Sequence, residues 1–569
     1  MKKMEYFICL ILVLVLMLTG ITGCSSKKDS GTNDTGTGST NLESQANAGS
    51  EAPAPADSAG DRSGSVAYDM DGSDYVANEE AQLSADMKYG LKITNEKELN
   101  GTPEFNMEEY NAIVENGFAS VRNNPVSTFS VDVDTASYSN IRRMINENRK
   151  VEPDAVRLEE MINYFKYDYE KPDSDIPFSV NTEISDCPWN ENAKLLLIGL
   201  QAEDIDLKER PSSNIVFLLD VSGSMNEENK LPLMQKAFVM LTENLNEKDR
   251  ISIVTYAGEE RVVLEGARGD ETIKITSAIE DLTADGSTAG SAGIEKAYEL
   301  AEDYYIEGGN NRIILATDGD LNVGITSEGA LTRLIEEKRE QGVFLSVLGF
   351  GTENIKDNKM EALADNGNGN YSYIDSLLEA KKVLVDEMGG TLFTVAKDVK
   401  LQVEFNPAKI KGYRLIGYEN RLLNTEDFDD DTKDAGEIGA GHRVTALYEL
   451  LTTDSKQEIP ETDLKYQAES NLTGSKDWLT VNIRYKEPDE TESKLLSVPV
   501  DESIYTEDMP DNLALASSVA SFGMLLRDSE YKGTSSYDKV LNTLSGLDVS
   551  SDEYKDEFVS LVKKMKRMD

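Results

Sequence analysis

The chain has 569 residues, and its 105 Asp and Glu against 57 Lys and Arg give a formal net charge of −48 at pH 7. This length is too great for one hydrophobic core and predicts roughly two to four domains with linkers. So much negative charge repels polyanions, which argues against nucleic acid or an anionic membrane surface as an electrostatic partner and favours divalent cations or basic proteins. The same acidity is also what an exported protein needs merely to stay soluble.

Residues 1–23 have the pattern of an export signal. Lys2 and Lys3 precede an apolar run from Tyr6 to Leu18. This run is too short for a membrane-spanning helix, which needs about 20 residues. Small residues then lead to Cys24, and the segment resembles a bacterial lipoprotein signal with its lipobox. That resemblance implies a diacylglycerol group on Cys24, which anchors the protein to the extracytoplasmic face of the cell membrane without spanning it. An ordinary secretory signal with an incidental cysteine is the alternative.

Residues 24–85, which follow the signal, are rich in Ser, Gly, Asn, Asp, Thr, Ala and Pro. Such a composition cannot bury enough apolar surface to order itself and predicts a flexible tether. With Cys9 removed in the signal and Cys24 acylated, Cys187 is the one remaining thiol, so no intrachain disulfide can form. We expect Cys187 to be a buried small hydrophobic residue and not a reactive one.

Residues 86–175 mix helical and extended patterns, and Phe129, Val131 and Val133 alternate as in a half-buried strand. The sequence Asp132-Val133-Asp134-Thr135 resembles the first motif of haloacid-dehalogenase-type phosphatases, in which the first Asp is the nucleophile and the second the general acid. The strand is only weakly apolar, and no later lysine and acidic-pair motifs follow in a matching fold. Metal-dependent, phosphatase-like catalysis by Asp132 and Asp134 is therefore kept as an alternative function.

Residues 213–392 alternate strand and helix patterns, which predicts a doubly wound, mostly parallel α/β sheet. The apolar run Ile215–Leu219 is unbroken, so we expect a strand covered on both faces. Asp220, Ser222 and Ser224 follow at its carboxyl end, the edge at which open α/β sheets bind ligands. Their oxygens point to one side, as a small divalent cation such as Mg²⁺ requires. An N-cap of the following helix explains this one segment equally well.

Two further segments offer oxygen ligands. A second apolar strand ends just before Asp318, and the small-residue loop 285–290 contains the hydroxyl of Thr288. Together with the Asp-x-Ser-x-Ser turn, they resemble the von Willebrand factor type A (VWA) family, which combines a Rossmann-like sheet with a metal-ion-dependent adhesion site. The resemblance implies that five residues surround one cation, Mg²⁺ or else Ca²⁺ or Mn²⁺: Asp220, Ser222, Ser224, Thr288 and Asp318.

Strand patterns lie on both sides of the α/β domain, in residues 176–212 and 393–505. Because domain termini usually lie close together, these strands can form one β-sandwich into which the α/β domain is inserted; two independent β-domains are the alternative. Residues 506–569 are predicted to be helical, with apolar faces that belong to a core. This tail and residues 86–175 also resemble the flanking modules of a bacterial subfamily of VWA proteins, the YfbK-like proteins.

The chemistry available to the chain is narrow. Its one histidine, His442, all but excludes a histidine-based triad or zinc site, and no phosphate-binding glycine loop supports a nucleotide. We therefore predict a lipid-anchored binding protein, not an enzyme, whose metal accepts an exposed Asp or Glu of a protein partner. Besides the phosphatase, a structural envelope protein whose metal only stabilises the fold stays open as an alternative.

Overall fold

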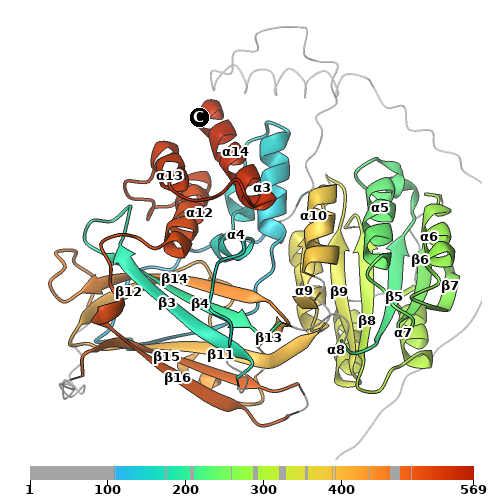
Figure 1. Ribbon diagram of the computed structural model, residues 1–569, viewed down its shortest axis with the longest axis horizontal. Coiled ribbons are helices and arrows are strands. Elements are labelled where there is room, and N and C mark those ends of the chain that lie inside the picture. The colour runs from blue at the N-terminus through green and yellow to red at the C-terminus, as the bar shows by residue number, and fades with distance from the viewer. Residues whose placement is uncertain are drawn as a thin grey trace, which may run out of the picture. The chain divides into compact units, whose positions relative to one another are not determined.

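The computed structural model describes residue 108 and residues 110–569, except 173–175, 205–209, 258, 286–292, 320–327, 353–355, 388, 391–392, 434, 462–474 and 489. The predicted signal and tether (1–85) and Thr288 lie outside the described residues. Within the part of the chain that is described, no helix has the length and apolarity needed to cross a bilayer. The described strands form three sheets, one in the α/β domain and two in a sandwich (Figure 1).

The α/β domain is built on a six-stranded sheet in the order β10-β9-β8-β5-β6-β7. Neighbouring strands are parallel except for β7, which is antiparallel to β6 at one edge. Every residue of β5 is buried. Because side chains alternate along a strand, Ile215, Phe217 and Leu219 face one layer of helices, while Val216 and Leu218 face the other. The strands are β5 (Ser213–Asp220), β6 (Arg250–Tyr256), β7 (Glu260–Arg268), β8 (Asn310–Thr317), β9 (Val343–Gly349) and β10 (Tyr371–Tyr373).

Helices cover both faces of this sheet. One face packs against α5 (Leu231–Thr242), α6 (Thr272–Glu280) and α10 (Leu377–Lys381), which continues as the π-helical turn η3 (Lys382–Asp386). The opposite face packs against α7 (Gly293–Asp303), α8 (Glu328–Glu340) and α9 (Asp357–Asn366). The predicted doubly wound α/β sheet is therefore confirmed.

Two further sheets face each other across a second core and form the sandwich. One has the order β1-β12-β14-β4-β3, and the other the order β13-β11-β15-β16 with β2 also paired to β11. Strand β4, which precedes the α/β domain, pairs with β14, which follows it. One sandwich with an inserted α/β domain is thus confirmed over two separate β-domains. The strands are β1 (Ala119–Ser120), β2 (Val126–Ser130), β3 (Phe178–Asp186), β4 (Lys194–Ala202), β11 (Thr394–Phe405), β12 (Ile410–Ile416), β13 (Gly436–Gly439), β14 (Arg443–Thr452), β15 (Asp477–Lys486) and β16 (Lys494–Asp501).

Helices from the two ends of the described chain share a third core, which lies on β4 and β14 of the sandwich. Tyr138 and Phe165 from the amino-terminal side belong to it, as do Phe522 and Phe558 from the carboxyl-terminal side. Cys187 is buried in the same core, as predicted. The helices are α3 (Ala136–Asn146), α4 (Leu158–Asn163), α12 (Asp511–Arg527), α13 (Tyr537–Leu544) and α14 (Glu553–Met568), with the short turn η1 (Pro153–Ala155) before α4.

Both connections between the α/β domain and the sandwich lie at the amino edge of the parallel sheet. Arg210, just before β5, forms an ion pair with Asp249, just before β6. The Arg210 guanidinium also lies 5.7 Å from the centre of the Phe393 ring, which precedes β11. The carboxyl edge, where the predicted metal ligands lie, is therefore the edge opposite the two connections.

Candidate metal centre

Asp220 and Asp318 lie next to each other at the carboxyl edge of the sheet. Strands β5 and β8 are parallel neighbours whose register pairs Leu219 with Ala316, so Asp220 is level with Thr317 and Asp318 follows directly. The Thr317 hydroxyl donates to Oδ2 of Asp220 at 3.4 Å. Two segments that are almost 100 residues apart in sequence are thus brought together by strand pairing, as the sequence predicts.

The turn after β5 brings its two hydroxyls together. The backbone N–H of Ser222 donates to Oδ1 of Asp220 at 2.9 Å, and Oγ of Ser222 lies 2.9 Å from Oγ of Ser224. Ser222 occupies the N-cap position of the short helix η2 (Gly223–Asn226), yet its side chain makes no capping hydrogen bond. The N-cap interpretation therefore does not account for the Ser222 hydroxyl. Instead, the turn places the side-chain oxygens of Ser222 and Ser224 next to each other.

The carboxylate of Asp318 faces Lys230, a residue that no sequence motif marks. Its Oδ2 accepts a hydrogen bond from Nζ of Lys230 at 3.2 Å, whereas its Oδ1 is buried with no hydrogen-bond partner among the described residues. The stem of Lys230 lies against Gly351, where an added Cβ would overlap Cε of the lysine. Lys230 is the first basic residue after the Asp-x-Ser-x-Ser turn and directly precedes α5. That position is the signal that could have identified it.

Burial dominates the electrostatics of this edge. It raises the pKa of Asp220 to about 6; hydrogen bonds from Ser222 oppose the rise, and the like charge of Asp318 adds to it. Burial likewise raises the pKa of Tyr256, and the nearby Asp220 carboxylate adds to this rise. Asp220 and Ser222 have no exposed surface, whereas Ser224 is exposed. The group of oxygens is therefore sealed on its inner side and reaches solvent at Ser224.

These residues fit a hard divalent cation. Two carboxylates and two hydroxyls supply oxygen ligands of the kind that Mg²⁺, Ca²⁺ and Mn²⁺ prefer, and one buried carboxylate oxygen has no other partner among the described residues. Asp220, Ser222, Ser224 and Asp318 would hold the ion, which would supply positive charge at the surface for an anionic ligand. No group of three or more His, Cys, Asp or Glu side chains in the described ranges is placed to bind a metal. A metal site at this edge would therefore need the hydroxyls of Ser222 and Ser224 as ligands beside the two aspartates.

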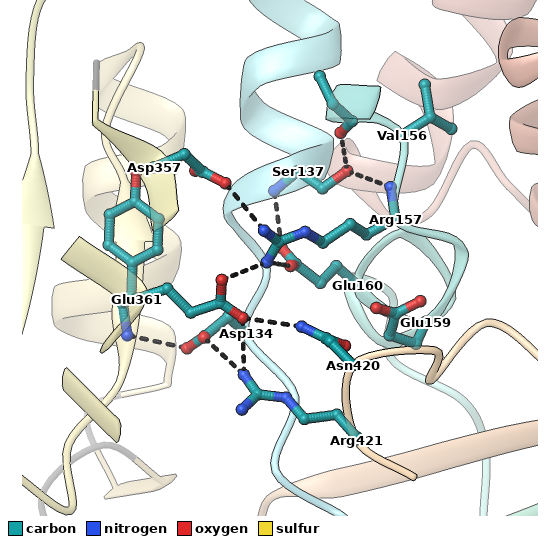
Figure 2. Close-up of polar contacts among 12 residues, drawn as sticks. Asp134, Ser137, Val156, Arg157, Glu159, Glu160, Asp357, Glu361, Asn420 and Arg421 are labelled. Atoms are coloured by element: carbon teal, nitrogen blue, oxygen red, sulfur yellow. Dashed lines mark hydrogen bonds and ion pairs between the residues drawn. The ribbon is translucent and has the colours of Figure 1, made fainter. Parts of the chain in front are cut away.

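The aspartates of the phosphatase alternative lie elsewhere, at a contact between the α/β domain and the rest of the chain. Arg421 forms ion pairs with Asp132 at 3.1 Å and with Asp134 at 3.4 Å. The other oxygen of Asp134 accepts a hydrogen bond from the backbone N–H of Tyr371 at 2.8 Å (Figure 2). Asp134 is only 3% exposed, and burial raises its pKa well above the usual range. A sealed, ion-paired Asp134 cannot reach a substrate, so this arrangement supports a structural role.

The same contact is rich in buried charge, and local sequence patterns did not reveal it. Arg421 also pairs with Glu361 and Asp365 of α9. Arg157 pairs with Glu361, Asp357 and Glu160 (Figure 2). Burial raises the pKa of three of these carboxyl groups to about 7. The ionic network is defined here as two arginines and six carboxyl groups: Arg157, Arg421, Asp132, Asp134, Glu160, Asp357, Glu361 and Asp365.

A cavity of about 220 Å³ borders this network. Its walls include Asp132, Asp365 and Arg421 from the network, together with Arg312 and His442. Burial lowers the pKa of His442, which therefore lacks a charge at neutral pH. The four described residues of the candidate metal centre do not line this cavity, so the cavity and the centre are separate features.

Comparisons with known proteins agree with this architecture. Residues 214–386 match the family model described as von Willebrand factor type A domain, residues 104–197 match one described as von Willebrand factor, and residues 390–568 match one described as Uncharacterized protein YfbK, C-terminal. The chain is 43% identical over 466 residues to Uncharacterized protein YfbK of Escherichia coli, covering 80% of each chain.

A second relative, Uncharacterized protein sll0103 of Synechocystis, is 26% identical over 319 residues, which are 55% of this chain and 70% of that protein. Among solved structures, a von Willebrand factor type A protein from Catenulispora acidiphila is 15% identical with a TM-score of 0.37 and covers 70% of this chain and 91% of that chain. Both relatives are described as uncharacterized.

Proposed function

The chain belongs to the YfbK family, and we propose that it is a membrane-anchored, extracytoplasmic binding protein that recognises a protein partner through a metal-ion-dependent adhesion site. Its VWA domain is a module generally used for interaction and not for catalysis, which supports binding over turnover. The exposed Asp or Glu of the partner would complete the coordination of the cation. We propose no enzymatic activity for Asp132 and Asp134.

The arrangement of oxygen atoms at the carboxyl edge of the sheet carries this proposal. Strand pairing sets Asp220 and Asp318 side by side, the hydroxyls of Ser222 and Ser224 lie 2.9 Å apart, and Oδ1 of Asp318 is buried without a partner among the described residues. A cation held by so few protein oxygens keeps positions for water or a ligand. We include Thr288 as the fifth ligand by its resemblance to the family motif.

Metal binding is tested by isothermal titration of full-length protein with Mg²⁺, Mn²⁺ and Ca²⁺. We expect saturable binding by the wild type and none by Asp220→Ala. The matched control is Asp281→Asn, which removes an exposed carboxylate next to α6. Equal binding by the wild type and Asp220→Ala would refute the site.

Partner binding is tested by cross-linking in intact cells, followed by recovery of the protein with and without chelator. We expect at least one protein whose capture is lost both with chelator and in Asp220→Ala. Metal-dependent thermal stability without any chelator-sensitive capture would favour the purely structural role instead.

The membrane anchor is tested separately by cell fractionation. Cys24→Ala removes the predicted acylation site, so the protein should move from the membrane fraction to the soluble fraction. Retention of the variant in the membrane fraction would contradict a lipid anchor at Cys24.

A further inference from the structure

Lys230 places a positive charge inside the candidate metal centre. Its Nζ lies 3.2 Å from Oδ2 of Asp318, and the two side chains are only 8% and 2% exposed. The position is built into the fold, because Gly351 has φ +80° and leaves room for the lysine stem, and the Gly351 N–H donates to the carbonyl of Asn229 at 3.2 Å. A buried ammonium that pairs with one of the candidate ligands must change the charge that a metal encounters.

Among the described residues of the candidate metal centre, the charged side chains are those of Asp220, Asp318 and Lys230. Counted formally, the two aspartates contribute −2 and Lys230 contributes +1, while the phenol of Tyr256 contributes nothing because burial raises its pKa. The centre without metal therefore has a formal charge of −1, and a divalent cation brings it to +1. A single carboxylate from outside then neutralises it. Without Lys230, the same cation would already neutralise the centre, and an incoming carboxylate would leave an excess negative charge.

We propose that Lys230 is a built-in counter-cation of the metal centre, which weakens metal binding in the absence of a ligand and strengthens binding of a carboxylate once metal is bound. This inference rests on the metal site of the proposed function. Metal and acidic partner should therefore bind cooperatively. The metal supplies the positive charge that attracts the carboxylate, and the carboxylate neutralises the excess positive charge that the metal and Lys230 create together. The lysine therefore favours a monoanionic carboxylate as ligand over a neutral group.

The first experiment measures Mn²⁺ affinity by isothermal titration of the full-length protein. Lys230→Met keeps an unbranched stem against Gly351 but removes a unit positive charge a few ångströms from the cation. It should therefore bind Mn²⁺ about tenfold more tightly, a change of about 1.4 kcal/mol. Lys230→Arg keeps the charge and should stay within about twofold of the wild type. Thermal melts verify that each variant is folded, and Lys230→Gln serves as a second neutral variant.

The second experiment titrates acetate, as the carboxylate probe, into protein saturated with Mn²⁺. Acetate should bind the wild type and Lys230→Arg with similar affinity, and Lys230→Met about tenfold more weakly. Unchanged or weaker Mn²⁺ binding by both neutral variants would overturn the role of Lys230 while leaving the metal site intact. Absence of Mn²⁺ binding by the wild type would overturn the metal site itself and this inference with it.

Discussion

The ionic network makes a prediction about pH that Asp357 can test alone. Asp357 is 5% exposed, and its Oδ2 lies 3.4 Å from Nη2 of Arg157. Burial raises its pKa to about 7, with Arg157 opposing the rise and Glu160 and Glu361 adding to it. Asp357→Asn preserves the shape of the side chain and removes the titration, so it isolates the cost of ionising this one group.

The sign and size follow from linkage. The pKa of Asp357 in the folded protein is raised above its unfolded value of about 4, so the stability it contributes is present at low pH and is lost as the pH rises through about 7. For one such group the loss between about pH 6 and about pH 8 is about 1.3 kcal/mol. The stability of Asp357→Asn relative to the wild type should therefore increase by about 1.3 kcal/mol between these two pH values.

The assay is urea denaturation followed by circular dichroism at about pH 6, 7 and 8, since midpoints at constant slope report the free energy of unfolding. Glu243→Gln, at an exposed position just after α5, removes the same charge outside the network and serves as the control. Its pH profile should parallel that of the wild type. If the profile of Asp357→Asn also runs parallel to the wild type, then Asp357 does not titrate between about pH 6 and about pH 8, and the reasoning from burial to a pKa of about 7 is refuted.

Buried charge, tight packing and the metal centre each give one more prediction. Arg142→Met should lower the free energy of unfolding by about 3–5 kcal/mol in chemical denaturation, because it removes the partner of three carboxylates at the α3–α10–α14 contact. Gly369→Ala should destabilise far more than Gly308→Ala in thermal melts: a Cβ at 369 would overlap a backbone oxygen, while a Cβ at 308 meets nothing within 4 Å and costs only the strain of φ +66°. Mn²⁺ at about 100 times its dissociation constant should stabilise the wild type by about 2.7 kcal/mol, and Asp220→Ala by nothing measurable.

The sequence predicts the α/β domain well because burial on both faces of a parallel sheet leaves a strong local pattern. The run Ile215–Leu219 has no polar residue, and the structure buries all of it. The position of Asp318 beside Asp220 was also predictable, since both follow apolar strands and parallel strands share one carboxyl edge. In these places local pattern and tertiary structure agree.

Contacts between distant segments left no such pattern. Strand β2 belongs to residues 86–175, which the sequence groups into an amino-terminal module, and it pairs with β11, about 270 residues later. Arg157 and Arg421 resemble ordinary surface residues in the sequence, and only the fold brings six carboxyl groups around them. Lys230 also leaves no pattern in the sequence, because its partner Asp318 follows a strand almost 90 residues later in the chain.

The way the α/β domain is inserted bears on how a partner could reach the metal centre. Both connections lie at the amino edge, where Arg210 packs on Phe393 and pairs with Asp249. The opposite edge contains Asp220 and the exposed Ser224, where the proposed partner would bind. The ionic network links α9 to the sandwich through Arg421, so the α/β domain also contacts the rest of the chain away from its two connections. Loosening this contact at high pH should change stability without changing the arrangement of the candidate metal ligands.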